Sequence, residues 1–264
     1  MTSAPNRRRI AIVAESFLPD MNGVTNSVLR ITEQLRARGH DCAVIAPGPG
    51  ASHVDGVPVI RVRSCDLPRG GDMRIGLPTA RLTRLLRRID PDVVHLAAPA
   101  VLGAAGARAA RNLGLPCVAV YQTDLAGFAR RRHLGFASRA IWRWIRHVHS
   151  LADVNLAPST AAAWALRDQR VPSVRVWGRG VDLDRFHPAR RSEELRGLLA
   201  PGGHRLVGYV GRLAGEKQVH RLAALEHLSD TQVVVVGDGP AAPVLRRLLP
   251  GSVFLGARDG EALA

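Results

Sequence analysis

The chain has 264 residues, of which 46% are hydrophobic, so it can bury one large core or two modest ones. Apolar stretches stay shorter than the roughly 18 residues of a membrane span, and the three cysteines lack disulfide or metal-ligand spacing, so we expect a cytoplasmic protein without a metal. The net charge of +15 indicates anionic partners, but only 4% of the residues are aromatic, which disfavours nucleic acid.

Short β-branched runs alternate with helical stretches in the first half of the chain, a pattern typical of parallel strands covered by helices on both faces. Helices are expected at residues 24–35, 78–89 and 100–113, the first with a C-terminal stop at Gly39. The expected strands are residues 10–14, 42–46, 57–62, 92–96, 116–121, 154–157 and 174–177. The first half is therefore predicted to be a doubly wound α/β domain.

A polar stretch at 178–203 that contains Gly and Pro interrupts this rhythm and predicts a domain boundary. We expect an N-terminal Rossmann-like domain at 1–180 and a linker with a second α/β domain at 181–264. The second domain should contain strands at 205–211, 232–236 and 252–255 and helices at 219–228 and 241–249. Three strands make a thin parallel sheet, so this domain is expected to be incomplete.

The turn between the first strand and the first helix, residues 15–24, is the first candidate site. Gly23 stands at the helix start, where backbone N–H groups can approach an anion and the helix dipole favours negative charge. The alternative is an ordinary loop in which Asn22 or Gly23 caps the helix. Gly48-Pro49-Gly50 opens no convincing helix and is rejected as a dinucleotide-binding fingerprint.

The second candidate site is residues 211–217, directly after the strand that opens the second domain. Open α/β sheets bind ligands at this end of their strands, and Arg212 and Lys217 could hold a diphosphate there. The alternative is a solvated basic loop. Lys217 argues against it, because all other basic residues of the chain, apart from histidine, are arginine.

Three segments carry a resemblance in their order and spacing: residues 11–19 with Asn22-Gly23-Val24, Gly180-Val181-Asp182 with Phe186 and Pro188, and Gly211-Arg212-Leu213 with Glu216-Lys217. Together they resemble family 4 of the retaining glycosyltransferases across nearly the whole chain. The first segment and residues 121–124 are most similar to actinobacterial GDP-mannose-dependent α-mannosyltransferases that elongate mannosylated glycolipids.

The resemblance implies a GT-B fold, with two Rossmann-like domains and the nucleotide sugar held mainly by the second. It implies transfer of a hexose, here mannose from GDP-mannose, to a glycolipid or glycan acceptor with retention of configuration. UDP- and ADP-sugars stay open as donors. No metal and no cofactor beyond the nucleotide sugar are expected.

Site residues follow from the same resemblance. Arg212 and Lys217 would neutralise the departing diphosphate in an interdomain crevice, and Leu255 would line the nucleobase pocket. The remaining donor contacts would be Asn22, Gly23 and Gly211.

Two departures from the family pattern affect the expected activity. Many members carry a histidine where this chain has Gln122, which can hydrogen-bond a sugar hydroxyl but cannot shuttle a proton. Gln122 is therefore expected to position the acceptor, with Asp124 as a nearby acceptor contact. The pair of glutamates that family members carry near the donor sugar has no counterpart before Ala264, so we expect these residues alone to transfer sugar poorly.

The basic stretch at 130–150 predicts a helix with an apolar face, an arginine face and two tryptophans at its sides. Such a helix suits an anionic membrane surface, which would make the protein peripheral on the inner face of the plasma membrane. The alternative is a helix docked on its own domain. Two further function classes stay open, an inactive remnant that binds sugar nucleotides and, ranked last, a basic nucleic-acid-binding protein. Asp238, between two glycines, is expected to be structural.

Overall fold

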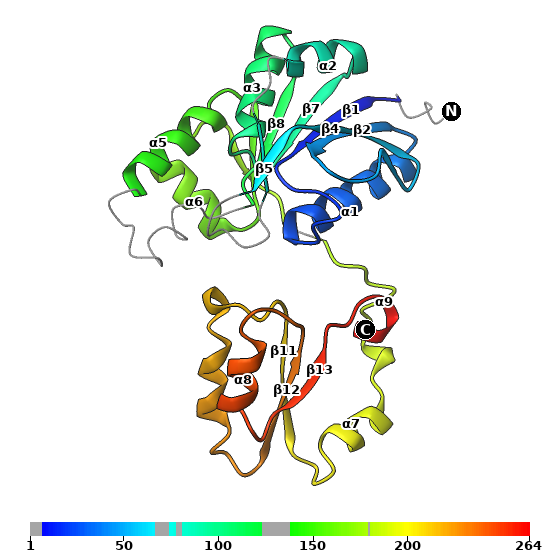
Figure 1. The fold of residues 1–264 in the computed structure, drawn as a ribbon, viewed down its shortest axis with the longest axis vertical. Coiled ribbons are helices and arrows are strands. Elements are labelled where there is room, and N and C mark those ends of the chain that lie inside the picture. The colour runs from blue at the N-terminus through cyan, green and yellow to red at the C-terminus, as the bar shows by residue number, and fades with distance from the viewer. Residues whose placement is uncertain (1–6, 67–73, 78–80, 123–137, 179) are drawn as a thin grey trace. The chain divides into compact units, whose positions relative to one another are not determined.

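The computed structural model describes residues 7–66, 74–77, 81–122, 138–178 and 180–264. The chain forms two compact units, Met1–Arg179 and Gly180–Ala264 (Figure 1). Both units are α/β with parallel sheets, as the sequence predicts. No helix in the described part of the chain has the length and apolar character needed to cross a bilayer.

The first unit is built on one sheet with the strand order β10-β9-β8-β7-β1-β2-β4-β3. Neighbouring strands are parallel except β3 and β4, so β1, β7 and β8 end at the same edge. The strands are β1 (Arg9–Ala14), β2 (Asp41–Pro47), β3 (His53–Val54), β4 (Val57–Val62), β7 (Val93–Ala97), β8 (Cys117–Val120), β9 (Val154–Ala157) and β10 (Val174–Val176).

Helices cover both faces of the central strands. On one face, α2 (Arg81–Ile89) and α3 (Leu102–Asn112) pack their apolar side chains against alternate residues of β1 and β7. On the other face, α1 (Gly23–Ala37) packs against the remaining residues of β1 and β2. Gly106 lets α3 approach closely, because a Cβ there would lie 3.1 Å from Leu96 Cδ2. Burial on both faces explains why these strands are almost entirely apolar.

At one side of the sheet, α5 (Ser138–His149) and α6 (Thr160–Asp168) pack with β9 in a smaller core. A buried polar pair ties this region together. His149 Nδ1 lies 2.6 Å from Asn155 Oδ1, and Asn155 Nδ2 donates to the carbonyl oxygens of His149 and Pro172. The sequence did not predict α6, nor the hairpin of β5 (Ser64–Asp66) and β6 (Arg74–Gly76).

The helix α5 is docked on its own unit, with Trp142 half-buried and Trp144 38% exposed. Ile145 and Val148 are buried, Trp142 stacks on Tyr121 at 6.2 Å, and Trp144 Nε1 donates to Ala100 O at 2.8 Å. Residues 130–137 of the predicted basic stretch lie outside the described residues.

The second unit has one sheet in the order β11-β12-β13, all parallel. Its inner core packs Val233 and Val235 of the central strand against α8 and η4. The elements are α7 (Glu193–Leu199), β11 (Arg205–Val210), β12 (Thr231–Val236), α8 (Ala242–Leu248), β13 (Val253–Gly256), α9 (Gly260–Leu263) and the 3₁₀ turns η2 (Pro188–Arg190), η3 (Gly215–Lys217) and η4 (Val219–Leu225).

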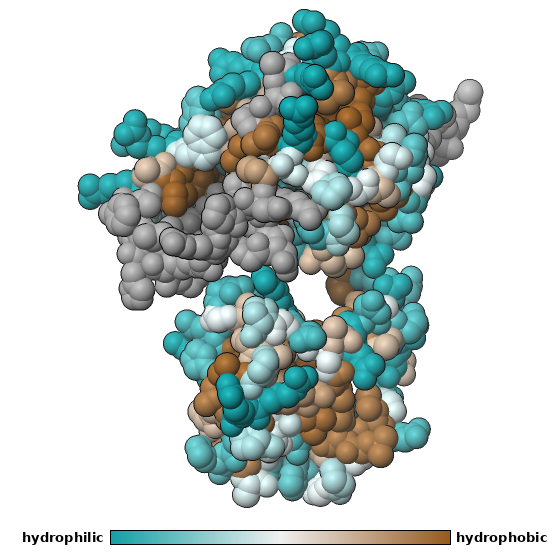
Figure 2. Space-filling model, in the orientation of Figure 1, coloured by the Kyte–Doolittle hydropathy of each residue, from teal (hydrophilic) through white to brown (hydrophobic). Residues whose placement is uncertain are grey.

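The opposite face of this small sheet is poorly covered. Val210 is 61% exposed, and Leu206, Val236, Val253 and Leu255 are half-buried. Apolar residues gather on one side of this unit in the space-filling view (Figure 2). A parallel sheet is ordinarily covered on both faces, so this unit presents one complete and one incomplete layer.

The predicted helix at 219–228 was wrong in type, since η4 is a 3₁₀ helix. It starts from Gln218, whose φ of 53° is left-handed, and no side chain caps it. Its backbone bonds span three residues, as from the Arg221 N–H to the Gln218 carbonyl at 3.0 Å. Bonds between residues three apart define a 3₁₀ helix.

Candidate functional site

The loop that follows β1 is held by its own side chains. Phe17 is 4% exposed and anchors the loop in the core under α1. The Asp20 N–H donates to the Phe17 carbonyl at 3.2 Å, and Thr25 Oγ1 donates to the Asp20 carbonyl at 2.7 Å. These bonds fix the loop so that residues 21–23 face solvent at the start of α1.

Asn22 is the N-cap of α1, as one of the two predicted alternatives has it. Its Oδ1 accepts the N–H groups of Val24 at 2.9 Å and Thr25 at 3.1 Å, and its Nδ2 donates to Ser16 Oγ at 2.6 Å. The cap leaves the N–H of Gly23 unused. Since the first turn of α1 has no acidic residue, an anion approaching Gly23 meets the positive end of the helix.

Glu15 holds this loop against the residues that begin α3, a role that the sequence analysis did not predict. Its carboxylate accepts backbone N–H groups from Ala100 at 2.6 Å, Val101 at 2.8 Å, Leu102 at 3.2 Å and Gly103 at 2.7 Å. Burial raises the pKa of Glu15, and the four N–H donors offset part of that increase. Glu15 thus joins the end of β1 to the start of α3.

Arg61 is a second supporting residue that the sequence analysis missed. Its Nη1 donates to Pro47 O at 3.0 Å, its Nε donates to Ala51 O at 3.1 Å, and its guanidinium lies 5.7 Å from the centre of the Phe17 ring. Gly50 is needed beside it, because a Cβ there would lie 2.4 Å from Arg61 Nη2. Gly50 also has a φ of 154°, and a Cβ there would lie 2.8 Å from Leu18 O, so this glycine serves close packing.

Gln122 lies just beyond β8 and is half-buried beside the buried Tyr121. Because β1, β7 and β8 are parallel neighbours, Gln122 and the Asn22-Gly23 turn lie at the same edge of one sheet, with the end of β7 between them. Asp124, the other predicted acceptor contact, lies outside the described residues.

In the second unit, the loop after β11 is pinned on both sides of Arg212. The Gly211 N–H donates to Val236 O at 2.9 Å, and the Leu213 N–H donates to Asp238 O at 2.9 Å. Leu213 is fully buried, and its carbonyl accepts the Ala241 N–H at 3.0 Å. The backbone at Arg212 is therefore fixed while its side chain stays 62% exposed.

The cations of this loop are available to an anion. Arg212 Nη1 lies 4.0 Å from Glu216 Oε1, the outer limit of an ion pair, and both side chains contact water. Such a pair contributes little and can yield to a phosphate. Lys217 ends η3, is exposed, and donates its backbone N–H to Ala214 O at 3.0 Å. Two cations and one carboxylate leave a net positive loop.

Gly237 and Gly239 explain how the loops after β11 and β12 meet. A Cβ at Gly237 would lie 1.9 Å from Gly211 O, and one at Gly239 would lie 2.4 Å from Leu213 O. Asp238 Oδ1 accepts the Gly239 N–H at 2.7 Å, a local bond consistent with the expected structural role. The Gly237 N–H donates to Gly256 O at 2.8 Å, so Leu255 of β13 lies at this same edge.

The described residues include His, Cys, Asp and Glu side chains, which are common metal ligands. Among those residues, no group of three or more His, Cys, Asp or Glu lies close enough to hold an ion. Arg212 and Lys217 are exposed cations of the loop after β11.

The sequence of the chain is similar to those of known proteins. The family model described as Glycosyltransferase Family 4 matches residues 21–185. Over 262 residues the chain is 53% identical to a GDP-mannose-dependent alpha-mannosyltransferase of Mycolicibacterium smegmatis, covering 97% of this chain and 70% of that protein. It is 49% identical to the protein of the same name from Corynebacterium glutamicum, covering 97% of this chain and 63% of that protein.

Solved structures agree on the fold. The Anabaena protein Alr3699/HepE, in complex with UDP, superposes with a TM-score of 0.72 at 19% identity, covering 95% of this chain and 69% of that one. This structural match confirms the predicted fold class, α/β of the GT-B type with a partial second domain. With two Rossmann-like units and close relatives over nearly its whole length, the chain belongs to glycosyltransferase family 4.

Proposed function

We propose that this chain binds GDP-mannose and serves the transfer of mannose to a lipid-linked or glycan acceptor, with retention of the anomeric configuration. The observation that carries the proposal is the 53% identity over 262 residues to an enzyme named for GDP-mannose. The exposed, backbone-pinned cations after β11 supply the chemistry that a diphosphate requires. Because the chain spans 63% to 70% of these relatives, the activity of the complete enzyme is part of the proposal.

In the proposed mechanism, charge develops on the β-phosphate as the bond between the sugar carbon and the phosphate oxygen breaks. Arg212 supplies a planar fork to the phosphate oxygens, and Lys217 a mobile point charge. Gly23 adds a backbone N–H at the positive end of α1. The acceptor hydroxyl forms the new bond on the face that the phosphate leaves, and its proton passes to the departing phosphate oxygen.

The other proposed contacts surround the sugar and the base. Gln122 orients a hydroxyl without taking its proton, since an amide is not a base. Asp124 contacts the acceptor, and Leu255 and Gly211 contact the nucleotide at the edge of the second sheet. Neither a metal nor a resident cofactor is part of this proposal, because the two cations neutralise the diphosphate.

Calorimetric titration of the 264-residue chain with GDP-mannose is the direct test of donor binding. Arg212→Ala and Lys217→Ala should each weaken binding about tenfold, the loss of one charged contact. Arg205→Ala is the matched control, because Arg205 is an exposed arginine at the opposite end of β11. Equal weakening by all three variants would contradict a role specific to residues 211–217. If the chain binds UDP-glucose more tightly than GDP-mannose, the proposed donor is wrong.

Attachment to an anionic membrane is a second part of the proposal, supported by one surface of α5. Arg139, Arg143 and Arg146 recur on an exposed side of the helix and form no ion pair among the described residues. Each arginine near an anionic bilayer contributes about 1 kcal/mol. Vesicle flotation tests this proposal. The double variant Arg139→Glu with Arg143→Glu should no longer bind anionic vesicles. If the unchanged protein binds neutral and anionic vesicles equally, the proposed membrane attachment is wrong.

A further inference from the structure

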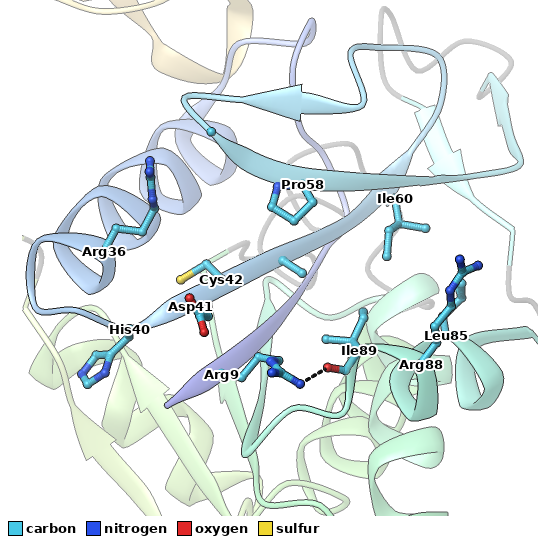
Figure 3. A pocket seen from close by; sticks show the side chains of 12 residues that line it. Arg9, Arg36, His40, Asp41, Cys42, Pro58, Ile60, Leu85, Arg88 and Ile89 are labelled. Carbon is cyan, nitrogen blue, oxygen red and sulfur yellow. Dashed lines mark hydrogen bonds between the residues drawn. The ribbon is translucent and has the colours of Figure 1, made fainter. Parts of the chain in front are cut away.

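A cavity opens in the first unit at the edge opposite the β1–α1 loop, and we call it the basal cavity (Figure 3). It has a volume of about 710 Å³, within the range of roughly 300–1,000 Å³ typical of small-molecule sites. Arg9 begins β1, and Asp41, Cys42 and Ala43 begin β2, so the cavity lies at the amino ends of these strands. The last turns of α2 close one side.

The walls of the basal cavity are apolar. Side chains from three elements line it: Ala43 of β2, Pro58 and Ile60 of β4, and Leu85 and Ile89 of α2. Pro58 and Ile60 lie along one side of the cavity in the close view, facing the side that carries Leu85 and Ile89 (Figure 3). Ile60, Leu85 and Ile89 are half-buried and Pro58 is exposed. Covering such apolar surface with an apolar group lowers the free energy.

Cys42 belongs to these walls as a neutral group. Burial raises the pKa of its thiol to about 11, so it is not a thiolate near neutral pH. The basal cavity is therefore not a site for covalent thiol chemistry.

The rim of the basal cavity is cationic. Arg36 and Arg88 lie at its two sides and Arg9 at its base (Figure 3). Backbone bonds hold two of these side chains in place: Arg9 Nη1 donates to Ile89 O at 3.0 Å and Asp90 O at 3.3 Å, and Arg36 Nη1 donates to Asp55 O. Arg88 forms no ion pair among the described residues and is exposed.

The acidic groups nearby do not cancel this charge. Asp41 is bound by both Arg7 Nη2 at 2.7 Å and Arg7 Nε at 2.9 Å. Asp92 accepts the Arg9 N–H at 2.7 Å and pairs with Arg8 at 3.3 Å. Each carboxylate thus has an arginine of its own, and both also attract Arg9. Arg36 and Arg88 form no ion pair among the described residues, so the rim keeps an excess of positive charge.

We propose that the basal cavity binds a small amphiphilic anion, a molecule with a phosphate or carboxylate head and an apolar body. The head would contact the arginines of the rim, and the body would cover the walls from Ala43 to Ile89. An inorganic anion would leave the walls hydrated, and a neutral amphiphile would leave the arginines without a partner. This site goes beyond the proposed transferase function, because it lies at the other end of the strands from Gly23.

The experiment is a titration of the 264-residue protein, followed by NMR or calorimetry, with octyl phosphate below its micellar concentration. Saturable binding is expected, at least about tenfold tighter than the binding of inorganic phosphate or of octyl glucoside. Arg88→Glu should weaken it about tenfold or more. Arg87→Glu is the matched control, since this exposed neighbour on α2 does not line the cavity, and it should change affinity less than about twofold.

Four results would overturn the proposal. They are no saturable binding of octyl phosphate, equal losses in Arg88→Glu and Arg87→Glu, equal binding of inorganic phosphate, and equal binding of octyl glucoside. Ile60→Ser tests the wall independently of charge and should weaken octyl phosphate binding while leaving inorganic phosphate unchanged. If Ile60→Ser leaves octyl phosphate binding unchanged, the apolar body does not lie against this wall.

Discussion

Glu15 accepts four backbone N–H groups on one carboxylate, so it joins the β1–α1 loop to the start of α3. Replacement of Glu15 by Gln keeps the shape but removes the charge and adds N–H donors where only acceptors fit. Hydrogen bonds to a charged group contribute about 1.5–3 kcal/mol, and we expect a loss of about that size. Urea unfolding followed by tryptophan fluorescence measures it, because Trp144 is bonded to Ala100 beside the same carboxylate.

Glu33→Gln is the control for this change. Glu33 is an exposed residue of α1 that pairs with Arg30 at 2.8 Å, and such surface pairs contribute at most about 1 kcal/mol. If the two variants unfold at the same urea concentration, the cap on α3 contributes nothing beyond a surface contact.

At the level of single residues, the structure confirms the Asn22 cap, because the residue type and its position before a helix are visible in the sequence. The phosphate contact of Arg212 stays a prediction, and its side chain is exposed as such a contact requires. Glu15 and Arg61 were missed because their partners are backbone atoms distant in sequence, Gly103 and Pro47 among them, and a backbone group leaves no signature in residue type.

At the level of elements, the loops after β11 and β12 depend on backbone-to-backbone contact. Gly237 has a φ of 140°, and a Cβ there would lie 1.9 Å from Gly211 O. Gly237→Ala should therefore destabilise the second unit by roughly 3 kcal/mol or more. Loss of this contact should also release Arg212, so donor affinity should fall with stability. Far-UV circular dichroism and amide hydrogen exchange of β12 measure the change.

Gly197→Ala makes the same chemical change in an open place of the same unit. A Cβ at Gly197, inside the helix α7, meets nothing within 4 Å. Alanine favours a helix over glycine by about 1 kcal/mol, so this variant should be unchanged or slightly more stable. Destabilisation of similar size in both variants would show that crowding at Gly211 is not the cause.

Strand positions were predictable because burial on both faces demands continuous apolar runs, as in β1 and β12. Helix type was not always predictable. The stretch after Gln218 has helical composition, yet it begins at a left-handed residue and forms the 3₁₀ helix η4. The helix α6 was missed because its alanines give little amphipathic contrast.

For the whole molecule, the division into two units determines what each probe reports. The four tryptophans are Trp142, Trp144, Trp164 and Trp177, and all lie in the unit Met1–Arg179. Tryptophan fluorescence thus follows the first unit alone, whereas circular dichroism follows both. When the two units unfold in different transitions, each unit has its own free energy of unfolding, and the chain as a whole has no single value.

The first unit should lose stability in mild acid because of buried histidines. The ring of His95 is buried in β7, packs edge-on to Trp177 at 6.5 Å, and has no hydrogen-bond partner for Nε2 among the described residues. Burial lowers the pKa of His95 from 6.5 to about 4. Burial also lowers the pKa of His149, which its bond to Asn155 partly offsets.

Because the unfolded chain binds the proton more readily, stability is full above the unfolded pKa near 6.5 and falls as pH falls below it. Between pH 7 and pH 5, His95 alone should cost about 2 kcal/mol, from about 1.36 kcal/mol per pKa unit. Urea unfolding by tryptophan fluorescence at the two pH values measures this loss. His95→Phe should reduce the loss by about 2 kcal/mol and leave the part due to His149, whereas replacement of the exposed His53 by Gln should leave the loss unchanged. If His95→Phe retains the full acid sensitivity, the buried ring of β7 is not its source.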